Sequence, residues 1–531
     1  MVLFHGQPDI WSDASSEAHS TLDVGFGVKI VSMRTLSWCL SSLAVPFFVL
    51  SALLAFVRIR DSLDSEREPT VFRRVLEGAE LMLNCAPMLC ILFLAAQIQA
   101  VHVSGGRDDP PEWILSCMQV ATAAYLAQTL LCVAAPAITG DVPVVDADVV
   151  VVRSRSAVVS TASHLLMLTL CVACSGICLG IMATQAAPDV PRSPSVSCTA
   201  GLAVQFFLVQ LLLSCAAASS PGGRSGCGPK IIRVLRLAAH TVFFAPMLCV
   251  LFIGARLRAM EVDRELGMPQ PWAQDAFYAC SYALLLQTSM VVLVPLLPGG
   301  DSRRGEGLMG GDVEVVLAQH EHGACRLLFA LLRFAPGLAL FGSVAVVIAS
   351  ILTLRSPGGA ATPALPATTR CLLALAVLFF AVYAGLWGAI AARDLAREVW
   401  GRGHGRFRRS VTALLYTPLR AASGVVQLCP MLAVLFLSLR LRSQQLAGNA
   451  GHPPRWAQGA MYLCTGSLVA LTLVSLAVGV ASPRKRPAGA EGSGFARAAL
   501  GIHALASACL HGGAAAVCVA LYIVTPESAR V

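Results

Sequence analysis

The chain has 531 residues, of which 56% are hydrophobic and only 13% are charged, and its mean hydropathy is +0.71. A soluble globular protein has about 25% charged residues, so this composition excludes a water-soluble fold and predicts an integral membrane protein. The net charge of +9 comes from basic residues that bunch beside apolar segments. Because they form no continuous basic face with aromatic residues, nucleic-acid binding is not predicted.

The N-terminal segment 1–35 is polar and includes Asp9, Asp13 and Glu17. A cleaved signal peptide has a short apolar stretch behind a basic start, and a transit peptide is poor in acidic residues. We therefore predict a polar tail that precedes an uncleaved first membrane helix.

Long apolar segments follow, each able to cross a hydrocarbon core of about 30 Å. Lipid cannot satisfy free backbone amides, and the segments are continuous rather than alternating, so they are predicted to be helices and not barrel strands. This gives an all-α membrane protein with about twelve transmembrane helices. The predicted spans are 36–57, 81–101, 113–136, 158–182, 198–219, 237–255, 274–297, 334–354, 371–392, 421–439, 459–480 and 500–524.

One apolar phrase occurs three times, as CAPMLCILF at 85–93, FAPMLCVLF at 244–252 and LCPMLAVLF at 428–436. A second phrase precedes each copy, as LAVPFF at 43–48, LAVQFF at 202–207 and LAVLFF at 375–380. A tryptophan follows each repeated proline after 26 residues, behind a proline-rich turn. Three motifs in the same order, with one interval unchanged in every copy, indicate an internal repeat.

Each complete copy contains four predicted spans, so successive copies run in the same direction through the membrane. We therefore predict parallel repeats, unlike the inverted repeats of many transporters. The hypothesis adds that the last helix replaces the missing first helix of unit 1. The predicted parts are the tail 1–35, a three-helix unit at 36–136, four-helix units at 158–297 and 334–480, and a final helix at 500–524.

The repeated prolines are predicted to kink their helices, because proline removes one backbone hydrogen bond and clashes with the carbonyl four residues earlier. Such a kink is either a hinge beside a cavity or a fixed packing bend. The three positions are Pro87, Pro246 and Pro430.

The repeated tryptophans are predicted to be interface anchors, because indole rings prefer the headgroup level of a bilayer. The prolines before them suit the start of the next helix. The three anchors are Trp113, Trp272 and Trp456.

Four polar residues deep in the predicted spans are candidates for function: Asn84, His240, Gln427 and His511. They either line a path for a solute or form hydrogen bonds between helices. No carboxylate lies near the centre of any predicted span, and this argues against an ion-coupled pump.

Metal and cofactor sites are not predicted. Cys171, Cys174 and Cys178 share one helix face, and His320 and His322 stand close together, but neither set has further ligands at metal spacing. Most of the cysteines lie in apolar spans and are predicted to be buried free thiols. The stretch 222–230 resembles a phosphate loop, except that proline occupies the lysine position. An enzyme is therefore not expected.

Basic residues predict the orientation, since the loops on one side hold 24 arginines and lysines and the other side holds 13. The positive-inside rule places the first side in the cytosol, so both termini and the tryptophan turns are predicted to be non-cytosolic. The sequence favours a passive transporter or channel-like protein for an unknown small solute, with the lipid bilayer as its one predicted partner. The alternative is a non-catalytic structural or receptor-like membrane protein.

Overall fold

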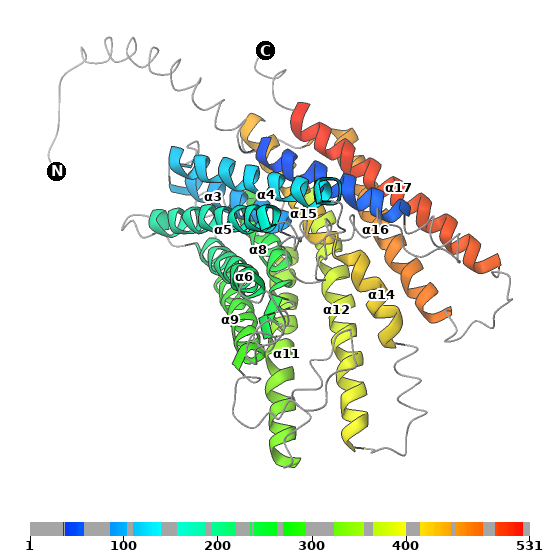
Figure 1. Cartoon of the computed structure of the whole chain (residues 1–531). Coiled ribbons are helices and arrows are strands. Elements are labelled where there is room, and N and C mark those ends of the chain that lie inside the picture. The colour runs from blue at the N-terminus through cyan, green and yellow to red at the C-terminus, as the bar shows by residue number, and fades with distance from the viewer. Residues whose placement is uncertain are drawn as a thin grey trace, which may run out of the picture.

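The described part of the chain is helical throughout and contains no strand (Figure 1). The computed structural model describes residues 36, 38–57, 85–103, 110–139, 157–185, 193–218, 234–235, 238–239, 241–262, 269–293, 323–354, 365–399, 415–447, 453–481 and 494–523. Its helices are Trp38–Val57, α3 (Ala86–Val103), α4 (Glu112–Thr139), α5 (Ala157–Gln185), α6 (Pro194–Ala218), α8 (Ala245–Val262), α9 (Pro271–Leu293), α11 (Gly323–Thr353), α12 (Ala367–Val399), α14 (Thr417–Val426), α15 (Cys429–Ala447), α16 (Arg455–Ala481) and α17 (Gly494–Ile523).

Eight helical stretches of the described residues are long and apolar enough to cross a membrane, as a multi-pass membrane protein requires. They are Trp38–Val57, Glu112–Leu131, Thr161–Ala183, Pro194–Leu213, Ala367–Ile390, Thr417–Leu441, Arg455–Val478 and Gly501–Leu521. Ala86–Val101 and Leu338–Thr353 are apolar but shorter. The eight helices account for part of the predicted set of about twelve, and the larger number stays a prediction.

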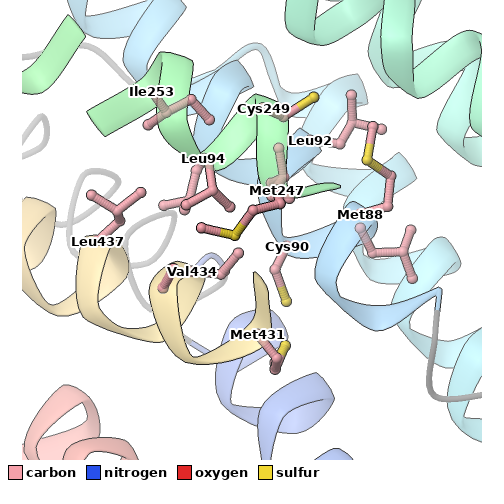
Figure 2. Packing of buried hydrophobic residues seen from close by; sticks show 14 of the residues in the cluster. Met88, Cys90, Leu92, Leu94, Met247, Cys249, Ile253, Met431, Val434 and Leu437 are labelled. Atoms are coloured by element: carbon pink, nitrogen blue, oxygen red, sulfur yellow. The ribbon is translucent and has the colours of Figure 1, made fainter. Parts of the chain in front are cut away.

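The three helices that carry the repeated phrase contact one another at the centre of the fold. From the first residue after each proline, two turns of α3, α8 and α15 are 3% exposed or less. Figure 2 shows side chains of the three helices, among them Met88, Met247 and Met431, gathered in one apolar contact. The core between the three helices is therefore filled by apolar side chains.

Other helices pack against these three. α3 contacts α5 and α6, while α8 contacts α11 and α12. α15 contacts α17, and α17 reaches the Trp38–Val57 helix through His511 and Phe48, whose ring centroids are 6.4 Å apart. The helices that begin at the tryptophans, α4, α9 and α16, each pack along the next helix in the chain, α5, α11 and α17.

The repeated prolines lie in the first turn of a helix rather than inside a continuous one. α14 ends at Val426, a turn follows at Gln427, and α15 begins at Cys429. α8 likewise begins after a turn, and α3 begins one residue before its proline. Proline suits this position because its missing N–H has no intrahelical partner there and its φ is already helical. The helix is thus interrupted by a turn just before Pro246 and Pro430, and whether the chain bends at the three prolines stays a prediction.

The repeated tryptophans occupy the second position of α4, α9 and α16, and their side chains are half exposed: Trp113 50%, Trp272 42% and Trp456 51%. In two copies a glutamine two residues later closes the turn, since Nε2 of Gln274 donates to the Pro269 carbonyl and Nε2 of Gln458 to the Pro453 carbonyl, both at 2.7 Å. Exposed indoles at helix starts suit interface anchors, and their level in the bilayer stays a prediction.

The α16–α17 crossing depends on the absence of a side chain at Gly513. A Cβ there would lie 2.7 Å from Cys464 Sγ and 3.2 Å from the Ala460 carbonyl oxygen, whereas a Cβ on the adjacent Gly512 would meet nothing. We expect Gly513→Val to lower the free energy of unfolding by about 1–3 kcal/mol through overpacking.

The matched control is Gly512→Val, which we expect to change stability by less than about 0.5 kcal/mol because that position is open. Thermal unfolding of the two purified variants compares them. Equal losses of stability would contradict the close crossing.

Candidate functional site

Two of the four candidate polar residues, Asn84 and His240, lie outside the described residues. The other two have different neighbours. Gln427 lies in the turn between α14 and α15, and His511 lies in the middle of α17. Whether the four line a common path stays a prediction.

The exposed side chain of Gln427 interacts with the hydroxyl of Tyr383 on α12. Phe243, which precedes its proline by the same three residues, lies 6.2 Å from the Tyr383 ring. Phe244 makes an edge contact with that ring at 4.9 Å. Tyr383 thus joins the helix breaks before α8 and α15, a role that the sequence analysis missed because this tyrosine lies outside the repeated phrase.

His511 is partly buried between α17 and the Trp38–Val57 helix. Its Nδ1 is 2.7 Å from the carbonyl oxygen of Ser507, one turn earlier. Its Nε2 is buried, and no described residue forms a hydrogen bond with it. With Phe48 at its ring edge, His511 takes part in helix packing.

The largest buried charged group in the described structure is an ion-pair network between α8 and α15. Glu261 Oε2 lies 3.1 Å from Arg258 Nη1, and its Oε1 accepts from Arg440 Nη2 at 2.8 Å and Nε at 3.2 Å. The side chains of both arginines are 4% exposed, and that of Glu261 is 10% exposed. Hydrogen bonds between a carboxylate and two guanidiniums stabilise the packing of α8 against α15. Removing one partner of such a buried ion pair is strongly destabilising.

Further buried polar side chains occupy corresponding positions in the repeated sequence of the central helices. Ten residues after the repeated proline, the three copies have Gln97, Arg256 and Arg440, and all are 3% exposed or less. Twelve residues after the proline, Gln99 is 1% exposed and Arg258 is 4% exposed. Neither amide atom of Gln99 has a hydrogen-bond partner among the described residues.

This group, which we call the arginine cluster, consists of Arg256, Arg258, Arg440, Glu261, Gln97 and Gln99. Its formal charge is three positive against one negative. Among carboxylates whose side chains are described, Glu112 and Asp275 are exposed and only Glu261 lies within the cluster. The C-terminal ends of three helices lend it partial negative charge, yet burying each ion still costs several kcal/mol.

The sequence analysis overlooked the arginine cluster because it placed these positions at or beyond the ends of the predicted spans and counted the arginines as loop charges. A signal was present in the repeat. Each repeated proline is followed, at the same interval, by a triplet of similar pattern: QIQ from Gln97, RLR from Arg256 and RLR from Arg440. Charges repeated at helix-core positions are costly, so their repetition points to function.

Within the described residues, no group of three histidine, cysteine, aspartate or glutamate side chains is arranged to hold a metal ion. The cysteines of the shared α5 face, Cys171, Cys174 and Cys178, are buried free thiols, while His320 and His322 lie outside the described residues. What the arginine cluster can supply is a set of strong hydrogen-bond donors.

Comparison with known proteins gives no relative from which a function can be carried over. No protein-family model matches the chain, and neither does any curated protein.

Proposed function

We propose that this chain is a passive transporter for a small solute, built from three parallel units around α3, α8 and α15. The observation that carries the proposal is the arginine cluster at the ends of these helices. Buried ionisable groups in membrane proteins are expensive and typically mark substrate or ion pathways. The long apolar helices of the chain suit such a role.

Corresponding contacts support the parallel units and the closure of the ring by the last helix. Positions 171, 341 and 511 follow one another at intervals of 170 residues, and each contacts the second phenylalanine of a repeated Phe-Phe pair. Cys171 Sγ lies 3.8 Å from the Phe207 carbonyl oxygen, the Phe341 and Phe380 rings are 6.3 Å apart at 77°, and the His511 and Phe48 rings are 6.4 Å apart at 79°. α17 therefore fits the place of a first helix for unit 1.

We infer that the transport is passive because, among the described residues, the cluster has no carboxylate besides Glu261. Glu261 has both oxygens engaged by Arg258 and Arg440. A proton- or sodium-driven cycle needs a carboxylate that changes its charge or ligands.

The alternative function, a structural or receptor-like membrane protein, is favoured by a different observation. The apolar contact between α3, α8 and α15 is filled, with each labelled side chain of Figure 2 at 3% exposure or less. Transport along this contact would require the helices to separate, whereas a scaffold would need only the packed state.

The orientation proposed for the chain follows from its basic loops. Loops that contain Arg58–Arg74, Arg224–Lys230 and Arg393–Arg409 should face the cytosol, with both termini on the opposite side. An N-terminal epitope tag in sealed right-side-out vesicles should be open to external protease, and a protected tag would reverse the orientation.

Solute flux in proteoliposomes tests the transport proposal. The full chain should accelerate uptake of at least one small solute from a panel, and Gln427→Leu should reduce the rate with little loss of stability because this side chain is exposed. If no member of a panel of ions, sugars, amino acids and phosphate esters moves faster than in empty liposomes, the scaffold alternative stands.

A further inference from the structure

We propose that the outer face of α9 binds the same face of a second copy of this chain within the membrane, with Tyr282 at the centre of the contact. The proposal goes beyond the transport proposal and its scaffold alternative, and it holds for either function. It depends on a tyrosine whose position the packing within the chain does not explain.

The contact face is a stripe of exposed side chains along α9. The helix packs against α6, α8 and α11, while residues three or four positions apart on its other side are exposed. Tyr282 is the most prominent of them, at 66% exposure. The stripe consists of Asp275, Tyr278, Ala279, Tyr282, Leu285 and Leu286.

Tyr282 lies near the middle of the bilayer, because of its distance from Trp272. α9 packs along α11 as α4 packs along α5 and α16 along α17. Since stretches of α4 and α16 are long and apolar enough to span a membrane, α9 crosses it beside them. Ten residues separate Tyr282 from the half-exposed Trp272, which is about 15 Å at 1.5 Å per residue, or half of a core of about 30 Å.

The hydroxyl of Tyr282 needs a partner at this depth. No described residue forms a hydrogen bond with it, and lipid tails offer none, so an unpaired hydroxyl there is costly. Ten residues after the tryptophans of α4 and α16, the exposed residues are Ala123 and Gly466. Packing within a unit therefore does not require a tyrosine here, and a group on another molecule would satisfy its hydroxyl.

A second copy of the chain suits this hydroxyl because the group is self-complementary. A phenol hydroxyl both donates and accepts, and a two-fold axis along the membrane normal brings identical residues together at one depth. Ala279, nearly one turn earlier, is small and allows close approach of the two helices. Helices that cross at Tyr282 diverge towards Asp275, two turns nearer the helix start, where water screens the two carboxylates.

Photo-crosslinking in proteoliposomes of the purified full-length chain identifies the occupant of this face. With p-benzoylphenylalanine in place of Tyr282, irradiation should give a product of twice the monomer mass, in which position 282 is joined to α9 of another copy. The matched control has the same amino acid in place of Leu505, which is 68% exposed on α17, and should give lipid adducts only. Lipid adducts alone at position 282, or a crosslink to a helix other than α9, would overturn the proposal.

The strength of the contact is measured by single-molecule photobleaching of fluorescently tagged protein that is diluted in liposomes. Tyr282→Phe keeps the ring and removes the hydroxyl, so it should weaken dimerisation by about threefold or more, the effect of one interhelical hydrogen bond in a membrane. The side chain is exposed, so the variant should keep its fold.

The matched control is Tyr462→Phe, which should leave dimerisation unchanged. Tyr462 is exposed on α16, and the guanidinium of Arg370 in the same chain lies 5.9 Å from its ring centroid. If both variants dimerise as tightly as the unmodified protein, or if the unmodified protein stays monomeric at every protein density, the contact through Tyr282 is wrong.

Discussion

Replacement of Glu261 by leucine should lower the free energy of unfolding by about 3–5 kcal/mol. Arg258 and Arg440 are buried, and Glu261 is the described carboxylate that contacts them. Removing it takes away the described carboxylate contact of two buried guanidiniums. Unfolding of the purified variant in mixed detergent micelles, followed by circular dichroism, measures the loss.

Asp275→Leu is the matched control, because Asp275 is an exposed carboxylate near the start of α9. Its replacement should change stability by less than about 0.5 kcal/mol. If the two leucine variants lose the same amount, the ion-pair network does not stabilise the fold.

Phe252→Ala should give the other large effect, a loss of about 2–4 kcal/mol. The side chain is fully buried on α8 and lies 4.5 Å, centroid to centroid, from the buried ring of Phe277 on α9. Cutting a buried phenylalanine to alanine leaves a cavity, which costs about 3–5 kcal/mol in water-soluble proteins. A somewhat smaller loss is expected here, because packing rather than release of water drives helix association in lipid.

Phe56→Ala serves as the control for this change, since Phe56 is 65% exposed on the Trp38–Val57 helix and has no comparable packing. Thermal unfolding in the same detergent compares the two variants. A Phe252→Ala protein as stable as Phe56→Ala would show that α8 does not form part of a packed core.

The class of fold could be predicted because lipid imposes strict rules. Long apolar segments with few charges had to be helices, and the described structure consists of helices, eight of which are long enough to span a membrane. The repeated phrase also identified the residues that became most buried, including Met88, Met247 and Met431. Which helices would pack together could not be read from spacing, because every segment has apolar residues on several faces.

The arrangement around the prolines was only partly predictable. The sequence shows that a backbone hydrogen bond is lost at Pro430, but it does not decide between a bent helix and two helices. In the structure a turn at Gln427 separates α14 from α15 within the single apolar stretch Thr417–Leu441. The neighbour that joins two such turns, Tyr383, is distant in sequence, and only the packing of α12 brings it there.

The candidate site was the least predictable part. Hydropathy treats arginine as a loop residue, so Arg256 and Arg440 marked the ends of predicted spans. Their burial depends on a contact between α8 and α15, whose paired residues Glu261 and Arg440 are 179 positions apart. The repeat shows that Arg256 and Arg440 occupy corresponding positions, but it does not show that Arg440 pairs with Glu261.

A double-mutant cycle between Glu261 and Arg440 tests the central claim, that the proline-bearing helices pack together as the core of the fold. The free energy of unfolding is measured for the unmodified protein, Glu261→Leu, Arg440→Leu and the double variant. Direct contact at 2.8 Å predicts a coupling energy of at least about 1 kcal/mol, with the double variant more stable than the sum of the single losses implies. Losses that add within about 0.3 kcal/mol would contradict the contact between α8 and α15, and with it the three-helix core.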